Sequence, residues 1–451
     1  MSARGEGPRV EAVDGRSPSS LGVAPAPGGG ARDSWQNRAV LRSRSVRSIG
    51  FVVCCVLSLA GGAFGAPNAA TLAAAARERV GADQGVYVET SDGTVLVSQA
   101  ADRAVHPASV SKVPTTLALL KTLGPTHQFD TRFAGSGPVV GGVLEGDLVV
   151  DASGDPYLVD ENALLVLRAL VEGGVREVRG GLVVRGPFLF DWESQGASER
   201  LRRVLAGGAP ALAWQAVRGG TETTTPPALR FRGDGRAGGG PEVLLVTHRS
   251  QPLIPLVKAL NGYSNNIFAP FARAAGGIGQ VEAIARASVS SELRDEIVLG
   301  DGAGASPRNR LSPRATVALL RALDGELARY DHTLADVLPV AGVDEGTLRH
   351  RLDGPGERGV VTGKTGTYGD YGASALAGAL RTRSHGTVYF AVLNHGVPVD
   401  SARGRQDAFV RALLAEVDAE PWPYVRDEAP AFTRAKLEPG DGLAAGQDAG
   451  R

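Results

Sequence analysis

Cysteine, methionine and lysine are nearly missing from this sequence of 451 residues. There are two cysteines, Cys54 and Cys55, and both lie in the apolar run at residues 49–60. The rest of the chain can therefore form no disulfide and no metal site built on thiolates. Basic residues number 48, yet only five of them are lysine, so arginine is the usual cation here. Each remaining lysine needs a chemical reason.

The sequence also has no excess of charge of either sign. Lys and Arg total 48 and Asp and Glu total 48, so the formal net charge is zero. Phosphate binding needs a basic excess, and a nucleic-acid partner is therefore not expected. The seven histidines show no His-Glu-x-x-His spacing, so no metal site is expected. Hydrophobic residues make up 43%, which excludes a disordered protein, and the length allows two or three domains.

Residues 1–66 are predicted to be a disordered N-terminus that ends in a signal peptide. Residues 1–48 are rich in Gly, Pro, Ser and Arg, which is typical of disorder. Arginines then precede the apolar run at 49–60, and small residues follow it before Ala66. The run is shorter than the roughly 20 residues of a membrane-spanning helix. We therefore predict an exported protein of the periplasm or another extracytoplasmic space, with an uncleaved membrane anchor as the alternative.

The rest of the sequence indicates one sheet built from both ends of the chain. Helical spacing occurs at 71–80, 109–123, 252–261, 312–324 and 401–417, a hairpin pattern at 85–99, and strand patterns at 360–364, 374–382 and 387–394. These segments assign residues 67–132 and 243–420 to one domain. Residues 133–242 contain short strands, one helix at 160–172 and Gly/Pro-rich stretches, and are predicted to be a smaller inserted domain. The polar residues 421–451 are predicted to be a disordered tail.

The motif Ser109-Val110-Ser111-Lys112 begins one of the predicted helices. Residues three apart lie on one face of a helix, so the Ser109 hydroxyl and the Lys112 amine can meet. A serine hydroxyl is a weak nucleophile that needs a base. A lysine can be that base where burial or a nearby cation lowers its pKa. Taken alone, Ser109 could equally be a plain helix N-cap.

A second motif, Ser264-Asn265-Asn266, follows a predicted helix. The Ser264 hydroxyl can relay a proton, and the Asn266 amide can hydrogen-bond a substrate amide or Lys112. Such a triplet is common by chance, so it gains weight only from the motifs on either side of it.

A third motif, Lys364-Thr365-Gly366-Thr367, ends a predicted strand. Lys364 can supply a charge that favours the neutral form of the first lysine. Thr365 and Thr367 can hydrogen-bond a carboxylate, and Gly366 lets a substrate approach the strand backbone. The backbone N–H groups of Ser109 and Thr367 would form an oxyanion hole.

The order of the three motifs is more informative than any one of them. Ser-x-x-Lys, Ser-x-Asn and Lys-Thr-Gly in succession are typical of the active-serine penicillin-binding proteins and β-lactamases. A phosphate loop at Gly363-Lys364-Thr365 would need a glycine at position 358, which is Arg. No Gly-x-Ser-x-Gly elbow is present, so a Ser-His-Asp hydrolase has no motif in its favour.

Beyond these motifs, residues 70–418 resemble the class C low-molecular-mass penicillin-binding proteins, the D-alanyl-D-alanine carboxypeptidase/endopeptidase group. The segments that carry the resemblance occur in the family's order: His106-Pro107-Ala108-Ser109, Phe129-Asp130-Thr131, Gly154-Asp155-Pro156, His248-Arg249-Ser250-Gln251, Asp301-Gly302-Ala303-Gly304, Asn309-Arg310-Leu311-Ser312-Pro313 and Gly346-Thr347-Leu348. The resemblance implies an α/β (α+β) fold with a five-stranded antiparallel sheet, flanking helices and a smaller inserted domain.

The resemblance also implies a mechanism. Ser109 would attack the D-Ala-D-Ala carbonyl of peptidoglycan stem peptides, Lys112 would take its proton, and water would release the acyl-enzyme. Ser264, Asn266 and Lys364 would complete the proton network. Cleavage of peptide cross-links would be a second activity, β-lactam antibiotics would acylate Ser109, and no cofactor would be needed.

Some positions depart from the family. The inserted domain is shorter than usual, and Ala303 stands where the family has serine. Asp155 matches an acidic substrate-binding residue of the family, but it could equally be a turn residue before Pro156. An arginine that holds the substrate side chain in some relatives falls at Pro307, with Arg308 beside it.

Two other functions stay open at this point. A serine β-lactamase would share the acylation and hydrolyse the adduct quickly. A non-catalytic penicillin-binding or cell-wall assembly protein would keep the motifs without turnover. The oligomeric state is not indicated by the sequence.

Overall fold

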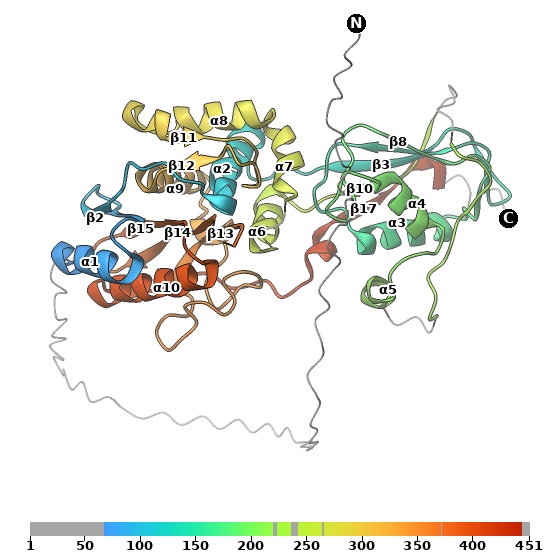
Figure 1. Ribbon diagram of the computed structural model, residues 1–451. Coiled ribbons are helices and arrows are strands. Elements are labelled where there is room, and N and C mark those ends of the chain that lie inside the picture. The colour runs from blue at the N-terminus through green and yellow to red at the C-terminus, as the bar shows by residue number, and fades with distance from the viewer. Residues whose placement is uncertain (1–66, 220–222, 236–241, 264–265, 371, 444–451) are drawn as a thin grey trace, which may run out of the picture. The chain divides into compact units, whose positions relative to one another are not determined.

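The computed structural model describes residues 67–219, 223–235, 242–263, 266–370 and 372–443 (Figure 1). Ser264 and the predicted signal segment lie outside the described residues. Among the described residues, no helix combines the length and the apolar character needed to cross a bilayer.

The first sheet is built from the two ends of the chain, as the sequence predicts. Its strands pair antiparallel in the order β13 (Val361–Tyr368), β14 (Ala373–Thr382), β15 (Thr387–His395), β1 (Gly85–Thr90) and β2 (Val95–Gln99), and the short β16 (Ala419–Glu420) pairs with the end of β14. The five-stranded antiparallel sheet of the expected fold class is therefore confirmed.

The two faces of this sheet carry different side chains and different helices. Alternate residues of β14 point to opposite faces, so Leu376 and Leu380 lie in one hydrophobic core and Ala375, Ala377 and Ala379 in another. The leucine face packs against α1 (Ala69–Ala75), the π-helical turn η1 (Ala76–Val80) and α10 (Val399–Glu416). The alanine face packs against α2 (Lys112–Leu123) and α9 (Pro313–Ala328) (Figure 1). Small side chains on that face let the turn before α2 lie close to β13 and β14.

Helix α2 is buried along most of its length. Its residues from Lys112 to Leu120 are all buried, and a helix that is enclosed on every side is a core helix. Pro114 falls in the first turn, where the missing N–H costs nothing. The helix ends at Gly124, which has φ +81° and donates its N–H to the Leu120 carbonyl at 2.9 Å. The first residue of this core helix, Lys112, is thereby carried into the interior.

The remaining elements of the same region complete the alanine-face core. They are η2 (Ala108–Ser111), α6 (Leu253–Tyr263), α7 (Phe268–Phe271), η3 (Ala272–Ala275), α8 (Ile278–Ala287), η4 (Ser291–Glu296), β11 (Ile297–Val298), β12 (Arg310–Leu311) and η5 (Leu334–Asp336).

A second five-stranded sheet includes strands from the region predicted to be inserted. Its order is β17 (Lys436–Pro439), β10 (Val243–Arg249), β3 (Asp130–Gly135), β6 (Leu148–Ala152) and β8 (Leu182–Arg185), with β8 parallel to β6. A separate core beneath it is formed with α3 (Asp160–Glu172), α4 (Ala197–Leu205) and α5 (Ala211–Val217). A small four-stranded sheet adds β4 (Val139–Val140), β5 (Val143–Leu144), β7 (Glu177–Val178) and β9 (Arg230–Phe231).

The second sheet differs from the expected boundaries at three strands. β3 crosses the expected boundary at residue 133, and β10 begins just after residue 242. β17 comes from the segment predicted to be a disordered tail. β17 pairs with β10 in the register Val246–Pro439 to Arg249–Lys436, and the turn η6 (Ala431–Arg434) precedes it. Residues 436–439 are therefore held by backbone pairing, which a polar composition does not reveal.

Candidate active site

The Ser109 hydroxyl and the Lys112 amine meet at the start of α2. Ser109 lies in the single turn η2, and Lys112 is the first residue of the helix that follows. The distance from Lys112 Nζ to Ser109 Oγ is 2.9 Å. Ala108, just before the serine, has φ +48°, a conformation that side chains other than glycine seldom adopt. Such backbone strain is often found next to reactive groups.

Burial changes the acid–base behaviour of Lys112. Its side chain is fully buried, and Nζ also donates to the Ala303 carbonyl at 2.6 Å and lies 5.6 Å from the centre of the Phe268 ring. Desolvation lowers the pKa of Lys112 to about 7, and the nearby Asp301 carboxylate opposes this only in part. A large share of Lys112 is therefore neutral near pH 7, which is the form that can accept a proton from Ser109.

Lys364 is a second fully buried lysine, on strand β13. Its Nζ donates to the Thr365 carbonyl at 2.9 Å. Burial, and then the charge of Lys112, hold the pKa of Lys364 well below its usual range. Two buried lysine amines that repel each other in this way are not both protonated at neutral pH. The charge expected from Lys364 therefore stays a prediction.

An open cleft of about 540 Å³ lies over these groups. It is lined by Ser109, Tyr263, Thr347, Arg351, Thr365, Gly366, Thr367, Arg403 and Asp407. The structure thus brings the first and third sequence motifs to one cavity, although more than 250 residues separate them in the chain. Ser109 is only partly buried, so its hydroxyl can be reached from the cleft.

Close backbone approach explains why glycines from two distant segments, Gly304 and Gly366, lie beside Ser109. A Cβ atom on Gly366 would lie 2.7 Å from the Pro107 carbonyl oxygen and 3.0 Å from the Ser109 nitrogen. Gly304 has φ +91°, and a Cβ atom there would overlap the Ala108 carbonyl. Strand β13 can therefore lie against the serine turn only because residue 366 has no side chain.

The second motif is only partly described. Ser264 lies outside the described residues. Asn266 is exposed, its carbonyl accepts from the Ala269 N–H at 3.0 Å, and it is not among the residues that line the cleft. The proton-relay roles of Ser264 and Asn266 therefore stay predictions.

The two residues predicted to contact the substrate side chain do not line the cleft. Arg308 is exposed, and its backbone N–H donates to the Ser306 hydroxyl at 3.3 Å. Asp155 is buried, with 2% of its surface exposed, and accepts the Tyr157 N–H at 2.8 Å. Its other oxygen lies 3.6 Å from Nδ1 of the buried His248. Asp155 therefore lies in an enclosed pair with His248, and its substrate-binding role stays a prediction.

Burial favours the neutral form of both members of this enclosed pair. It raises the pKa of Asp155 to about 7 and lowers that of His248 to about 4. Although the two side chains are within 4 Å of each other, the cost of removing both charges from water favours the protonated carboxyl and the neutral imidazole.

Several residues that line the cleft were missed from the sequence. Arg403, on α10, donates to the Thr367 hydroxyl at 3.2 Å. Arg351 pairs with Asp407 at 2.6 Å and is thereby largely neutralised. Thr347 accepts a hydrogen bond from the Thr365 hydroxyl at 2.7 Å. The only sequence signal was the segment Gly346-Thr347-Leu348, which belonged to the family resemblance without a role attached. Nothing in the motifs marks Arg403.

Within the ranges that the structure describes, no group of three or more His, Cys, Asp or Glu residues is arranged to hold a metal ion.

Residues 68–195 and 235–416 match the model of the D-Ala-D-Ala carboxypeptidase 3 (S13) family. The chain belongs to this family. It is 26% identical to a D-alanyl-D-alanine carboxypeptidase of Actinomadura sp. (strain R39), over 79% of this chain and 84% of that protein. The resemblance stated from the sequence is confirmed, and this member of the S13 family is a serine peptidase of the D-Ala-D-Ala carboxypeptidase class.

Solved structures of other proteins show the same fold. A predatory peptidoglycan endopeptidase from Bdellovibrio bacteriovorus matches with a TM-score of 0.64 and 20% identity, over 79% of this chain and 99% of that one. Penicillin binding protein 4 (dacB) from Haemophilus influenzae matches with a TM-score of 0.57 and 19% identity, over 77% of this chain and 99% of that one. At these identities the likeness concerns the fold alone.

Proposed function

We propose that this S13 peptidase releases D-alanine from peptidoglycan stem peptides through an acyl-enzyme on Ser109. The observation that carries the proposal is the 2.9 Å contact between Ser109 Oγ and the amine of Lys112, whose pKa burial lowers to about 7. A neutral lysine at that distance can take the hydroxyl proton as the oxygen attacks a carbonyl.

The reaction has two steps, acylation of Ser109 and hydrolysis of the acyl-enzyme. In acylation, Ser109 Oγ bonds to the carbonyl carbon of the penultimate D-alanine, the amide C–N bond breaks, and the proton held by Lys112 passes to the departing amine. In deacylation, water adds to the ester, one proton again passes through Lys112, and the Ser109 hydroxyl is restored. Ser264, Asn266 and Lys364 would share this proton path. The N–H groups of Ser109 and Thr367 would stabilise the oxyanion.

The terminal carboxylate of the substrate would lie against the hydroxyls of Thr365 and Thr367. Arg403 already donates to the Thr367 hydroxyl, so it adds a positive charge beside that position. Arg351 contributes less, because Asp407 pairs with it. A cation and two hydroxyls suit a carboxylate better than a neutral chain end.

Cleavage of peptide cross-links and acylation by β-lactams are parts of the same proposal. The Bdellovibrio protein is described as a peptidoglycan endopeptidase, and one of its structures is acylated by penicillin G. In this chain the activated Ser109, which opens on the cleft, suits both reactions. Such substrates lie outside the cytoplasm, and the segment at 49–66 supports export from it.

Fluorescent penicillin labelling followed by mass spectrometry tests this mechanism. We expect one adduct on the peptide that contains Ser109, and none in Ser109→Ala. Release of D-alanine from diacetyl-Lys-D-Ala-D-Ala should follow the same pattern. Rapid steady-state turnover of nitrocefin would instead favour a β-lactamase, and the absence of any adduct on correctly folded protein would favour a non-catalytic role.

A further inference from the structure

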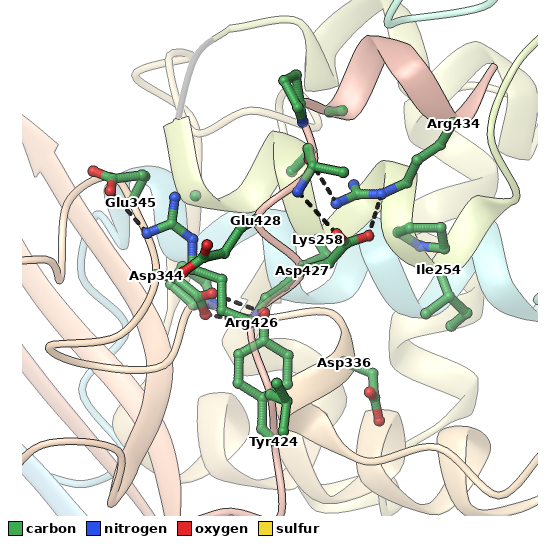
Figure 2. A pocket seen from close by; sticks show the side chains of 18 of the residues that line it. Ile254, Lys258, Asp336, Asp344, Glu345, Tyr424, Arg426, Asp427, Glu428 and Arg434 are labelled. Carbon is green, nitrogen blue, oxygen red and sulfur yellow. Dashed lines mark hydrogen bonds and ion pairs between the residues drawn. The ribbon is translucent and has the colours of Figure 1, made fainter. Parts of the chain in front are cut away.

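A second cavity lies next to the catalytic cleft and shares Tyr263 with it. Its volume is about 430 Å³. Helix α6, the segment 336–345 and the segment 424–434 form its walls (Figure 2). Tyr263, the last residue of α6, is 57% exposed, so its ring is accessible beside both cavities.

A short loop fixes which end of the cleft the second cavity adjoins. Glu345 lines the second cavity and Thr347 lines the cleft, with Gly346 between them. A Cβ atom on Gly346 would overlap the Gly262 carbonyl, so the loop lies directly against α6. Thr347 holds the Thr365 hydroxyl, which is on the side assigned to the departing residue. The second cavity therefore adjoins the leaving-group side.

Lys258 lines the second cavity, and several contacts hold its ammonium in place. Its ammonium donates to the carbonyls of Ala335 and Leu338, each at 2.7 Å, and pairs with Asp344 at 2.6 Å. The Tyr424 hydroxyl donates to the other Asp344 oxygen at 2.8 Å, and its ring lies 4.1 Å from the ammonium. Three acceptors around one nitrogen suit a tetrahedral ammonium rather than a planar guanidinium, which explains one more of the rare lysines.

The lining of this cavity is partly apolar and partly acidic. Ile254 and Val425 contribute apolar surface, and Val425 is 91% exposed. Two ion pairs are visible in Figure 2, Arg426 with Glu345 at 2.9 Å and Arg434 with Asp427 at 2.7 Å. Charged lining residues comprise three cations, Lys258, Arg426 and Arg434, and five carboxylates, Asp336, Asp344, Glu345, Asp427 and Glu428. The cavity therefore favours a neutral or cationic ligand over an anionic one.

We propose that this second cavity binds the leaving-group peptide of a cross-linked substrate, and that it prefers a chain whose side carboxyls are amidated. A departing D-alanine ends at its carboxylate and is accommodated by the cleft alone. A cross-link releases an amine that carries a further peptide, and only such a chain extends past Thr347 and Tyr263. The proposal rests on the peptidase mechanism of Ser109 and adds a subsite to it.

Val425→Trp tests the subsite on the full-length protein. Val425 does not line the cleft that contains Ser109, and its high exposure lets an indole be placed there without disturbing the core. We expect kcat/KM for a cross-linked peptide dimer to fall about tenfold, chiefly through KM, as for a lost contact of ordinary strength. Release of D-alanine from the monomeric pentapeptide should stay within about twofold. Leu212→Trp, at an exposed position of α5, is the matched control.

Charge preference gives an independent measurement. Glu428→Lys should raise kcat/KM for a dimer with free leaving-group carboxyls, relative to kcat/KM for the amidated dimer, by about threefold to tenfold. Equal losses on monomer and dimer in Val425→Trp, or no loss on either, would overturn the subsite, as would an unchanged preference in Glu428→Lys. Failure of the wild-type protein to release D-alanine from the monomer would contradict the proposed mechanism, and so the two failures are distinguishable.

Discussion

The regions around the first and the second sheet each bury a pair of ionisable side chains, with opposite consequences. Lys364 is on β13 of the first sheet and interacts with Lys112, and His248 is on β10 of the second sheet and pairs with Asp155. In both pairs burial favours the neutral form. Lys112 touches a serine that opens on a cleft, whereas neither Asp155 nor His248 lines that cleft. Burial therefore prepares a base only where the neutral group contacts a nucleophile that a substrate can reach.

Lys112→Arg should have the largest effect on activity, because it replaces the buried lysine that contacts the nucleophile. A guanidinium is positively charged at every working pH, so it cannot accept the Ser109 proton. We expect kcat/KM for D-alanine release to fall about 10³-fold. Lys121→Arg is the control, since Lys121 lies on the same helix and is 37% exposed beside Glu326. A variant that keeps more than a tenth of the activity would show that Lys112 is not the base.

Gly366→Ala tests the close approach of β13 to the serine turn. The added methyl would lie 2.7 Å from the Pro107 carbonyl oxygen, so the strand or the turn must shift by a fraction of an ångström. Displacements of this kind cost roughly 10²-fold in rate. We expect slower acylation by penicillin, measured by stopped flow. Gly404→Ala, where a Cβ atom would meet open space, should have no such effect.

The pH dependence of acylation gives a third test of the contrast between Lys112 and Asp155. Because the pKa of Lys112 is lowered to about 7, the neutral base is abundant above that pH and is lost below it. The acylation rate constant should therefore fall about tenfold per pH unit below 7 and level off above. Asp155→Asn should leave this profile unchanged, although the pKa of Asp155 is also about 7. A profile that is flat between pH 5 and 8 would contradict the assignment of Lys112.

Arg403→Gln should have a smaller effect, confined to the carboxylate end of the cleft. Loss of one charged hydrogen-bond donor is expected to raise KM for a peptide with a free C-terminus about tenfold. The effect should vanish for the C-terminal amide of the same peptide. Arg405→Gln, at an exposed position of the same helix outside the cleft lining, is the control. An equal loss on acid and amide would show that Arg403 does not bind the carboxylate.

The sequence predicted features set by neighbours in the chain better than features set by distant pairing, for physical reasons. Helical spacing alone places Lys112 beside Ser109, and alternating apolar residues mark the hairpin at 85–99. Helix α3 was predicted at its observed bounds, Asp160–Glu172. These features depend on neighbours in the chain. Strand β17 depends on a partner almost 200 residues away, and its residues Lys436–Pro439 have no apolar alternation to mark them.

Long-range packing also determines surroundings of Asp155 and Arg403 that the local sequence does not reveal. Asp155 has the local sequence of a substrate-binding loop, but the loop and β10 bury it against His248. Arg403 looks like any surface arginine of a C-terminal helix until that helix packs on the first sheet and places it beside Thr367. In each case the decisive neighbour is distant in sequence and lies outside any motif.

Asp155→Asn is expected to change stability rather than activity, and it tests the enclosed pair directly. The folded-state pKa of about 7 is above the unfolded value of 3.8, so the folded protein retains a proton that the unfolded chain releases. The contribution of Asp155 to stability should therefore fall as pH rises from about 4 to 7. A carboxamide stays neutral throughout, so the variant should lack this fall.

Between pH 5 and 8 the free energy of unfolding of the wild type should decrease by about 2 kcal/mol relative to that of Asp155→Asn, measured by urea denaturation. The titration of His248, whose unfolded form gains a proton below about pH 6.5, is common to both proteins and cancels in the difference. Asp83→Asn removes an exposed carboxylate and serves as the control. If the wild type and Asp155→Asn keep the same difference at pH 5 and 8, Asp155 is ionised in the fold, and the enclosed pair is a salt bridge after all.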